Sequence, residues 1–469
     1  MLNIVHGDHP TTRRELLGIG SLALGGLSLS TLLKLPAAAQ NPHRPLTGKS
    51  VIFLFQQGGP GQHETFDPKP LAPSNIRTVG GTIQTSVPGL YFGATMRRLS
   101  RLAHKFTIVR SFQTNNAGHN IQPLVGSDSL DANIGTHFAR VAGTTRSSTG
   151  MPTNAVLFPR AVDAGVPKPQ ARGNLSSTGA YGATYAPFVP GGASKLQDNM
   201  QLKLSRDRFL GERRPLLAEL DRLHRGIAAN NQLDAVDAIQ QQAYDILLGG
   251  GVARALDWTQ EAPGLIERYD TQRFVESDRW NKVSRGRKGY YNAQAATIGR
   301  LLLLARRLCE SGCGFVTIHA GYAGVWDMHA DGNNLNMEDG MRAVGRPFDH
   351  AVAAFIEDVE ARGMQDDILL VCCGEMGRTP RINKRGGRDH WSRLAPLLLY
   401  GGGMRGGNVI GASDRDGAEP AGDQQNPRHL ISTILRTVLN PGELRLIPGI
   451  PRDVHDLVEH PPIRGTGLA

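Results

Sequence analysis

Cysteine and aromatic side chains are scarce in this sequence: it has four Cys, and Phe, Trp and Tyr make up 6% of its 469 residues. Cys309 and Cys313 are four positions apart at the end of an expected helix, a geometry that does not favour a disulfide. Cys372 and Cys373 lie inside an apolar run and are expected to be buried. The sequence therefore argues against a disulfide scaffold and against a cysteine-based metal site.

Signals for nucleic acid and nucleotide binding are also missing. The formal net charge is +10, but the basic residues are scattered and no aromatic residues that could stack bases are interleaved with them. The glycine runs at 401–403 and 406–407 are not followed by the Lys-Ser/Thr of a phosphate-binding loop. We expect no nucleic-acid partner.

A long hydrophobic run is absent too. Residues 12–18 form a twin-arginine pattern around Arg13 and Arg14, and Ala37-Ala38-Ala39 resembles a cleavage site. The apolar run over 18–33 is shorter than the roughly 20 residues of a spanning helix. We predict a signal peptide over 1–39, export to the periplasm or beyond the cell, and no stable membrane span after cleavage, with a retained N-terminal anchor as the alternative.

Short apolar runs alternate with longer helical or irregular segments over 40–469. This alternation predicts one α/β domain with a mostly parallel central sheet sandwiched between helices, and the Gly, Ser, Pro and Ala of residues 126–203 predict a loop-rich insertion. Strands are expected over 50–56, 106–112, 314–319, 367–374 and 395–403, and helices over 207–231, 234–248, 287–310 and 348–362.

Acidic and imidazole side chains follow several of the expected strands. The carboxyl ends of parallel strands share one edge of a sheet, where open α/β folds bind ligands. We expect a metal site there, held by carboxylate oxygens and imidazole nitrogens, a mixture that suits Zn, Mn or another divalent ion. The candidate metal ligands are His63, Asp327, His329, Glu375, Asp389 and His390.

Each candidate also has a plainer interpretation. His329 and His390 each lie close to a Trp, so both fit packed, hydrogen-bonded histidines at a loop corner. Arg378 is suited either to hold a phosphate or sulfate by bidentate hydrogen bonds or to pair with Glu375. Asp67 fits the start of a turn better than a ligand.

At the level of motifs, the sequence resembles the exported DUF1501 family over nearly the whole chain after residue 39. The motifs are Arg13-Arg14, Gly58-Gly59-Pro60 with Thr65 to Pro70, Trp326-Asp327-x-His329, Gly374 to Pro380 and Gly387 to Trp391. That family resembles the alkaline phosphatase and sulfatase superfamily, which implies an alkaline-phosphatase-like α/β sandwich with a metal-dependent hydrolytic site.

The resemblance transfers to individual positions with departures. Asp327 and His329 echo a metal-ligand pair at shorter spacing, His390 matches the final histidine, and Glu375-Met376 stands where the superfamily has Asp-His. The first-strand Asp has no counterpart, because Gln56, Gln57 and Gly58 occupy that strand end, so His63 or Asp67 would have to substitute.

The nucleophile is the weakest correspondence. The superfamily spacing places it near Asn116, which cannot act as one; Thr114 is the nearest hydroxyl, and His119 is a candidate base or ligand. Together with Arg378 these are the candidate catalytic residues. A metal-activated water, with a pKa lowered towards about 7, removes the need for a side-chain nucleophile.

Two functions of different class follow. The first is an exported metal-dependent hydrolase of phosphate or sulfate esters, with a small-molecule or polysaccharide ester as substrate. The second is a catalytically degenerate member of the superfamily that binds a glycan or a protein. The missing first-strand Asp favours the second, and the retained carboxylates and histidines favour the first.

Overall fold

The computed structural model describes residues 44–146, 148–191, 251–276 and 285–467, together with two short strands, β1 (Val5–His6) and β2 (His9–Pro10). The helices predicted over 207–231 and 234–248 lie outside the described residues, as does most of the predicted signal peptide.

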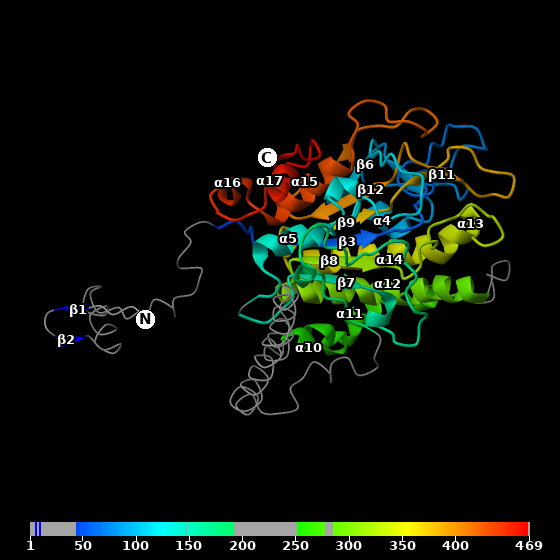
Figure 1. Ribbon diagram of the computed structural model, residues 1–469. Coiled ribbons are helices and arrows are strands. Elements are labelled where there is room, and N and C mark those ends of the chain that lie inside the picture. The colour runs from blue at the N-terminus through cyan, green and yellow to red at the C-terminus, as the bar shows by residue number, and fades with distance from the viewer. Residues whose placement is uncertain are drawn as a thin grey trace.

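A seven-stranded sheet forms the centre, in the order β13-β6-β12-β9-β3-β8-β7 (Figure 1). Every neighbouring pair is parallel except the two pairs that β12 makes, with β6 and β9. The prediction of a mostly parallel sheet is therefore confirmed. The strands are β3 (Ser50–Phe55), β6 (Phe106–Val109), β7 (Asn154–Leu157), β8 (Phe315–His319), β9 (Ile368–Cys373), β12 (Leu397–Gly401) and β13 (Val409–Ile410).

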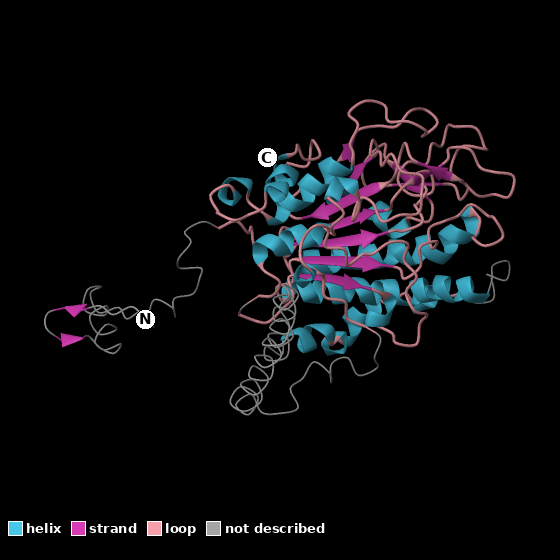
Figure 2. Ribbon diagram, viewed as in Figure 1, coloured by secondary structure: helices cyan, strands magenta, loops and turns pink. Residues whose placement is uncertain are grey.

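Two apolar cores cover the two faces of the sheet. Successive residues of a strand point to opposite faces, so Ile52 of β3 packs in one core and Val51 in the other. The first core receives α12 (Arg285–Glu310) and α14 (Arg346–Ala361), and the second receives α5 (Ile134–Ala142), α15 (Pro427–Val438) and α17 (Arg452–Glu459). Helices thus flank the strands, as Figure 2 shows, and the predicted sandwich is confirmed.

Shorter elements fill the connections. The further helices are α4 (Arg97–Arg101), α10 (Gly251–Leu256), α11 (Pro263–Arg268), α13 (Met337–Gly340) and α16 (Pro441–Leu444), with a π-helical segment, η8 (Met341–Gly345). The 3-10 turns are η1 (Ala103–Lys105), η2 (Ser127–Ser129), η3 (Pro159–Ala161), η4 (Ala183–Tyr185), η6 (Trp258–Gln260) and η7 (Gln272–Phe274). The remaining strands are β4 (Thr82–Gln84), β5 (Tyr91–Gly93), β10 (Gly377–Arg378) and β11 (His390–Trp391).

The segment predicted as a loop-rich insertion contains two unpredicted elements of the core, a helix and a strand. Helix α5 begins after Asn133, whose side chain accepts a hydrogen bond from the Gly135 N–H, and buries Ile134 and Phe138 against the sheet. Strand β7 is the edge strand beside β8 and has only four residues. A strand that short produces too little periodicity to be recognised among turns.

Strand β12 runs antiparallel to its two neighbours, and its direction determines which segments of the chain meet at one edge of the sheet. The carboxyl ends of β3, β6, β8 and β9 lie at one edge of the sheet, and antiparallel pairing brings the first residue of β12, Leu397, opposite the last residue of β9, Cys373. The segment that precedes β12 therefore arrives at the same edge as the segments that follow the other strands. Among the described helices, none has the length and apolar character needed to cross a bilayer.

Candidate metal centre

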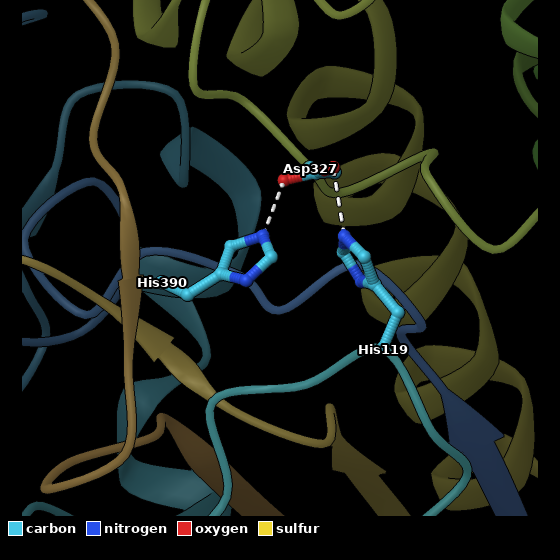
Figure 3. A group of neighbouring side chains, drawn as sticks. All are labelled: His119, Asp327 and His390. Carbon is cyan, nitrogen blue, oxygen red and sulfur yellow. Dashed lines mark hydrogen bonds and ion pairs between the residues drawn. The ribbon is translucent and has the colours of Figure 1, made fainter.

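Three side chains bring possible metal-ligand atoms within 4.8 Å of one another: His119, Asp327 and His390. His119 lies on the loop after β6, Asp327 follows β8, and His390 precedes β12. Figure 3 shows the two rings directed at the carboxylate from separate segments of the chain. No other such group occurs within the described ranges of the chain. The centre therefore lies at the edge of the sheet where β3, β6, β8 and β9 end.

The Asp327 carboxylate contacts both histidines of the centre and several neighbouring side chains. Its Oδ2 lies 2.9 Å from His119 Nε2 and 3.0 Å from His329 Nε2, and it accepts a hydrogen bond from Asn334 Nδ2 at 3.0 Å. Its Oδ1 accepts from Arg378 at 2.8 Å and lies 3.2 Å from His390 Nε2. Burial alone would raise the pKa of Asp327, but the hydrogen bonds from the three histidines and the charge of Arg378 hold it well below its ordinary value. The carboxylate is therefore ionised.

His119 lies between two carboxylates. Its Nδ1 is 3.2 Å from Glu375 Oε1 while its Nε2 faces Asp327, and its side chain is 8% exposed. Burial by itself would lower the pKa of His119, but the hydrogen bonds to Asp327 and Glu375 raise it to about 9. Without a metal ion the ring is an imidazolium that donates from both nitrogens.

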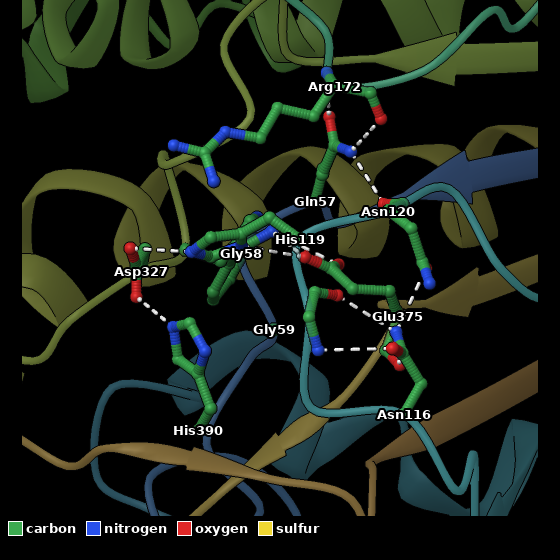
Figure 4. Close-up of polar contacts among 12 residues, drawn as sticks. Gln57, Gly58, Gly59, Asn116, His119, Asn120, Arg172, Asp327, Glu375 and His390 are labelled. Atoms are coloured by element: carbon green, nitrogen blue, oxygen red, sulfur yellow. Dashed lines mark hydrogen bonds and ion pairs between the residues drawn. The ribbon is translucent and has the colours of Figure 1, made fainter.

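Glu375 lies behind His119 and is fully buried. Its two oxygens accept from the Gly58 N–H at 2.8 and 3.1 Å (Figure 4), and burial raises its pKa. A carboxylate that holds one ring nitrogen of a histidine fixes the ring so that the other nitrogen can bind a metal. Glu375 was predicted to be a metal ligand, but it lies outside the group of ligand atoms and orients His119 instead.

His390 is oriented in a comparable way. Its Nδ1 lies 2.9 Å from the Ala117 carbonyl, so Nδ1 carries a proton and donates to that carbonyl, while Nε2 faces Asp327. The side chains of His390 and His329 are 27% and 25% exposed, so the centre meets solvent on their side. His329 approaches the same carboxylate oxygen as His119 but is not one of the three clustered ligands.

Two more of the predicted metal ligands, Asp389 and His63, lie apart from the three clustered side chains. Asp389 is exposed and its carboxylate accepts from Asn383 at 3.3 Å, because adjacent residues at the start of β11 point to opposite sides and His390 takes the inward one. His63 is fully buried, and its Nε2 lies 2.9 Å from the Asp416 carbonyl. Burial lowers the pKa of His63. Neither side chain belongs to the centre.

Arg378 has a different role from the two that the sequence suggested. Its guanidinium is fully buried and donates to the carbonyls of Gly58, Gly59, Trp326 and Arg388 as well as to Asp327. Because the guanidinium is fully buried among these acceptors, it is not exposed to hold a phosphate or sulfate. Its carboxylate partner is Asp327 rather than Glu375, and the guanidinium fixes the position of that carboxylate.

The loop that was predicted to carry the nucleophile also has a structural role. Thr114 is buried, and its hydroxyl donates to the Asn116 carbonyl at 3.4 Å within the same loop. Asn116, at the position where the superfamily spacing places a nucleophile, donates to the Glu375 carbonyl at 3.2 Å. The loop that carries His119 is thus tied to the end of β9.

Gln57 was not predicted as a functional residue, yet it anchors the same loop. Its Nε2 donates to the Asn120 carbonyl at 2.6 Å and the Arg172 carbonyl at 3.0 Å, as Figure 4 shows. His319 Nδ1 accepts from the Gly321 N–H at 2.9 Å, so its Nε2 donates to Gln57 Oε1 at 2.8 Å. The signal in the sequence is the uncharged Gln at a strand end where the motif resemblance led us to expect an Asp.

We expect the buried His319 to make the protein acid-sensitive. Burial lowers the pKa of His319 to about 3, whereas in the unfolded chain the same side chain has a pKa of about 6.5. Below pH 6.5 only the unfolded state takes up this proton, so stability falls as the pH drops towards 3. Between pH 7 and 4.5 the free energy of unfolding of the natural protein should fall by about 2–3 kcal/mol more than that of His319→Gln.

Urea unfolding at the two pH values measures this difference. His104→Gln, at an exposed histidine, is the control and should lose as much stability as the natural protein. An equal acid-induced loss in His319→Gln and the natural protein would show that His319 does not carry the effect.

The chain matches a family model and is similar to several distant solved structures. The family model described as "Protein of unknown function (DUF1501)" matches residues 48–444. No curated protein matches the sequence.

Solved structures that are similar to this chain at low identity include the following three. They are Ps i-CgsB (9% identity, 83% of this chain and 71% of that one, TM-score 0.35), the PsFucS1 sulfatase from Pseudoalteromonas sp. (12%, 93% and 74%, 0.33) and the phosphonate monoester hydrolase SpPMH from Silicibacter pomeroyi (11%, 82% and 72%, 0.25). All three TM-scores are below 0.5, so no activity is transferred from these structures to this chain.

Proposed function

Because the chain belongs to the DUF1501 family and gathers His119, Asp327 and His390 at one edge of its sheet, we propose that it is a metal-dependent hydrolase of phosphate or sulfate esters. The observation that carries the proposal is the orientation of the two rings. Glu375 holds one ring and the Ala117 carbonyl holds the other, and both present Nε2 to the Asp327 carboxylate.

The residues of the centre suit a divalent transition ion. Two imidazole nitrogens and one carboxylate oxygen form a donor set typical of Zn and also compatible with Mn. Three protein ligands leave a coordination position open, which distinguishes catalytic from structural zinc sites. When bound, such an ion supplies a Lewis acid that polarises an ester oxygen and lowers the pKa of water.

The protein's own residues prepare the site for that ion and for an anionic substrate. Arg378 keeps Asp327 ionised, and Glu375 and the Ala117 carbonyl fix the tautomers of the two rings. His119 must lose its Nε2 proton to bind an ion, so affinity rises with pH towards its pKa of about 9 and binding releases a proton. Lys384 and Arg385 are exposed on the loop before His390 and attract anions.

Elemental analysis of the purified chain from residue 40 onward tests the metal. After supply of Zn or Mn, we expect about one transition ion per chain in the natural protein and in the control His104→Ala, and none in His390→Ala. Esterase assays on phosphate and sulfate monoesters then follow. A natural protein that takes up no ion would contradict the proposal and favour the alternative of a glycan- or protein-binding module.

Glu375→Gln is expected to weaken metal affinity without removing a ligand. The amide lacks the negative charge that holds the His119 ring, and loss of such a partner typically lowers metal affinity 10–100-fold. Competition with a chromogenic chelator measures the dissociation constant. The control is Glu419→Gln, which removes the same negative charge from an exposed side chain. Unchanged affinity in Glu375→Gln would exclude its orienting role.

We also propose that the chain is exported by the twin-arginine route, on the basis of Arg13 and Arg14. Cell fractionation tests this, with the protein expected in the periplasm or medium and with recovery in the cytoplasm alone contradicting it.

A further inference from the structure

A cavity of about 460 Å³ lies away from the metal centre. Four arginines line it: Arg97 and Arg98 from α4, Arg273 from η7 and Arg346 from α14. A cavity of this volume falls in the range of small-molecule binding sites, which is about 300–1,000 Å³. Four guanidinium groups around one cavity repel one another unless negative charge balances them.

That balance is incomplete within the described part of the chain. Arg98 pairs with Glu357 at 2.6 Å and Arg346 with Glu276 at 3.3 Å, whereas the side chains of Arg97 and Arg273 have no carboxylate partner among the described residues. The one acid that lines the cavity, Asp349, accepts hydrogen bonds from the backbone N–H groups of α4 instead. The cavity therefore carries an excess of positive charge.

A neutral histidine holds two of these arginines together. His350 Nε2 lies 2.8 Å from the Arg268 carbonyl and donates to it, so Nδ1 is left as an acceptor. Arg98 Nη1 donates to this nitrogen at 2.8 Å and Arg273 Nη2 at 2.9 Å. Burial and the two arginines lower the pKa of His350 to about 4, so the ring remains neutral at neutral pH. It aligns two guanidinium groups without cancelling their charge.

We propose that this cavity binds a sulfate or phosphate group carried on an organic molecule. Guanidinium groups bind such oxyanions through paired, charge-assisted hydrogen bonds. The volume exceeds what a single tetrahedral anion requires, and Phe274, with Arg273 5.1 Å above its ring, adds an apolar wall for the carrier. The site needs no metal ion and is independent of the function proposed above.

Isothermal titration calorimetry of the metal-free chain tests this site, with glucose 6-sulfate, inorganic sulfate and glucose as probes. We expect glucose 6-sulfate to bind at least about tenfold more tightly than inorganic sulfate, and glucose not to bind. Arg273→Gln and Arg97→Gln should each weaken binding of the ester about tenfold. The control is Arg452→Gln, which removes a 92% exposed arginine from α17 and should bind like the natural protein.

Three results would overturn the proposal. They are no binding up to about 10 mM ester, equal affinity for the ester and inorganic sulfate, and unchanged affinity in both cavity variants. Arg97→Gln protects the test against misfolding, because the Arg97 side chain is exposed and makes no hydrogen bond or ion pair within the described ranges.

Discussion

Asp327→Ala should be the most destabilising single change at the centre, lowering the free energy of unfolding of the metal-free protein by about 3–5 kcal/mol. The variant leaves the fully buried guanidinium of Arg378 without its carboxylate. It also removes the shared acceptor of His119, His329 and Asn334. Urea denaturation monitored by fluorescence and by circular dichroism measures the loss.

His390→Ala is the matched comparison for this prediction. It removes a ring that is 27% exposed and that makes one contact to Asp327 and one to a carbonyl, so we expect a cost of about 1 kcal/mol or less without metal. Both variants should fail to retain an ion. If Asp327→Ala were as stable as His390→Ala, the carbonyl partners of Arg378 would be sufficient to stabilise it.

Gly58→Ala should disrupt the centre through the backbone. Gly58 has φ +113°, and a Cβ there would lie 2.6 Å from the Asp327 nitrogen and 2.7 Å from the Trp326 nitrogen. These backbone atoms cannot easily move, because the two N–H groups donate to the carbonyls of Gly324 and Gln57. We expect a loss of more than about 2 kcal/mol and loss of metal, since the conformation alone costs about 1–2 kcal/mol.

Gly81→Ala separates the two causes. Gly81 has φ +79°, but nothing lies within 4 Å of a Cβ built on it, so only the conformational cost of about 1–2 kcal/mol applies. The difference in unfolding free energy between the two variants isolates the steric clash with the segment that carries Asp327. Equal losses would show that this close approach does not contribute.

Sequence predicted the central strands well and the edge of the sheet poorly. Uninterrupted apolar runs such as 51–55 and 368–373 are buried on both faces, and such runs can be recognised in the sequence itself. Strands β7 and β13 have four and two residues, and their place in the sheet depends on pairing with distant strands. Local sequence contains no such information.

The site was predicted in outline because strand ends converge, but the orientation of its side chains was not. Asp327 and His390, both predicted as metal ligands, lie close together, whereas Asp389, one residue away from His390, points to solvent. For Arg378 the sequence left two roles open, a phosphate or sulfate clamp and a pair with Glu375, because a sequence does not show that the guanidinium is buried among carbonyls and Asp327. The function of a charged side chain depended on burial, which is a tertiary property.

The three clustered side chains come from distant parts of the chain: His119 and Asp327 are 208 positions apart, and Asp327 and His390 are 63. Their convergence requires the strands between them to be paired, so an ion would bind the folded chain and have little affinity for the unfolded one. Such linkage stabilises the fold by about 4 kcal/mol when free ion exceeds its dissociation constant a thousandfold. Under the proposed function, resistance to heat and proteolysis would therefore follow the supply of metal in the compartment where the protein acts.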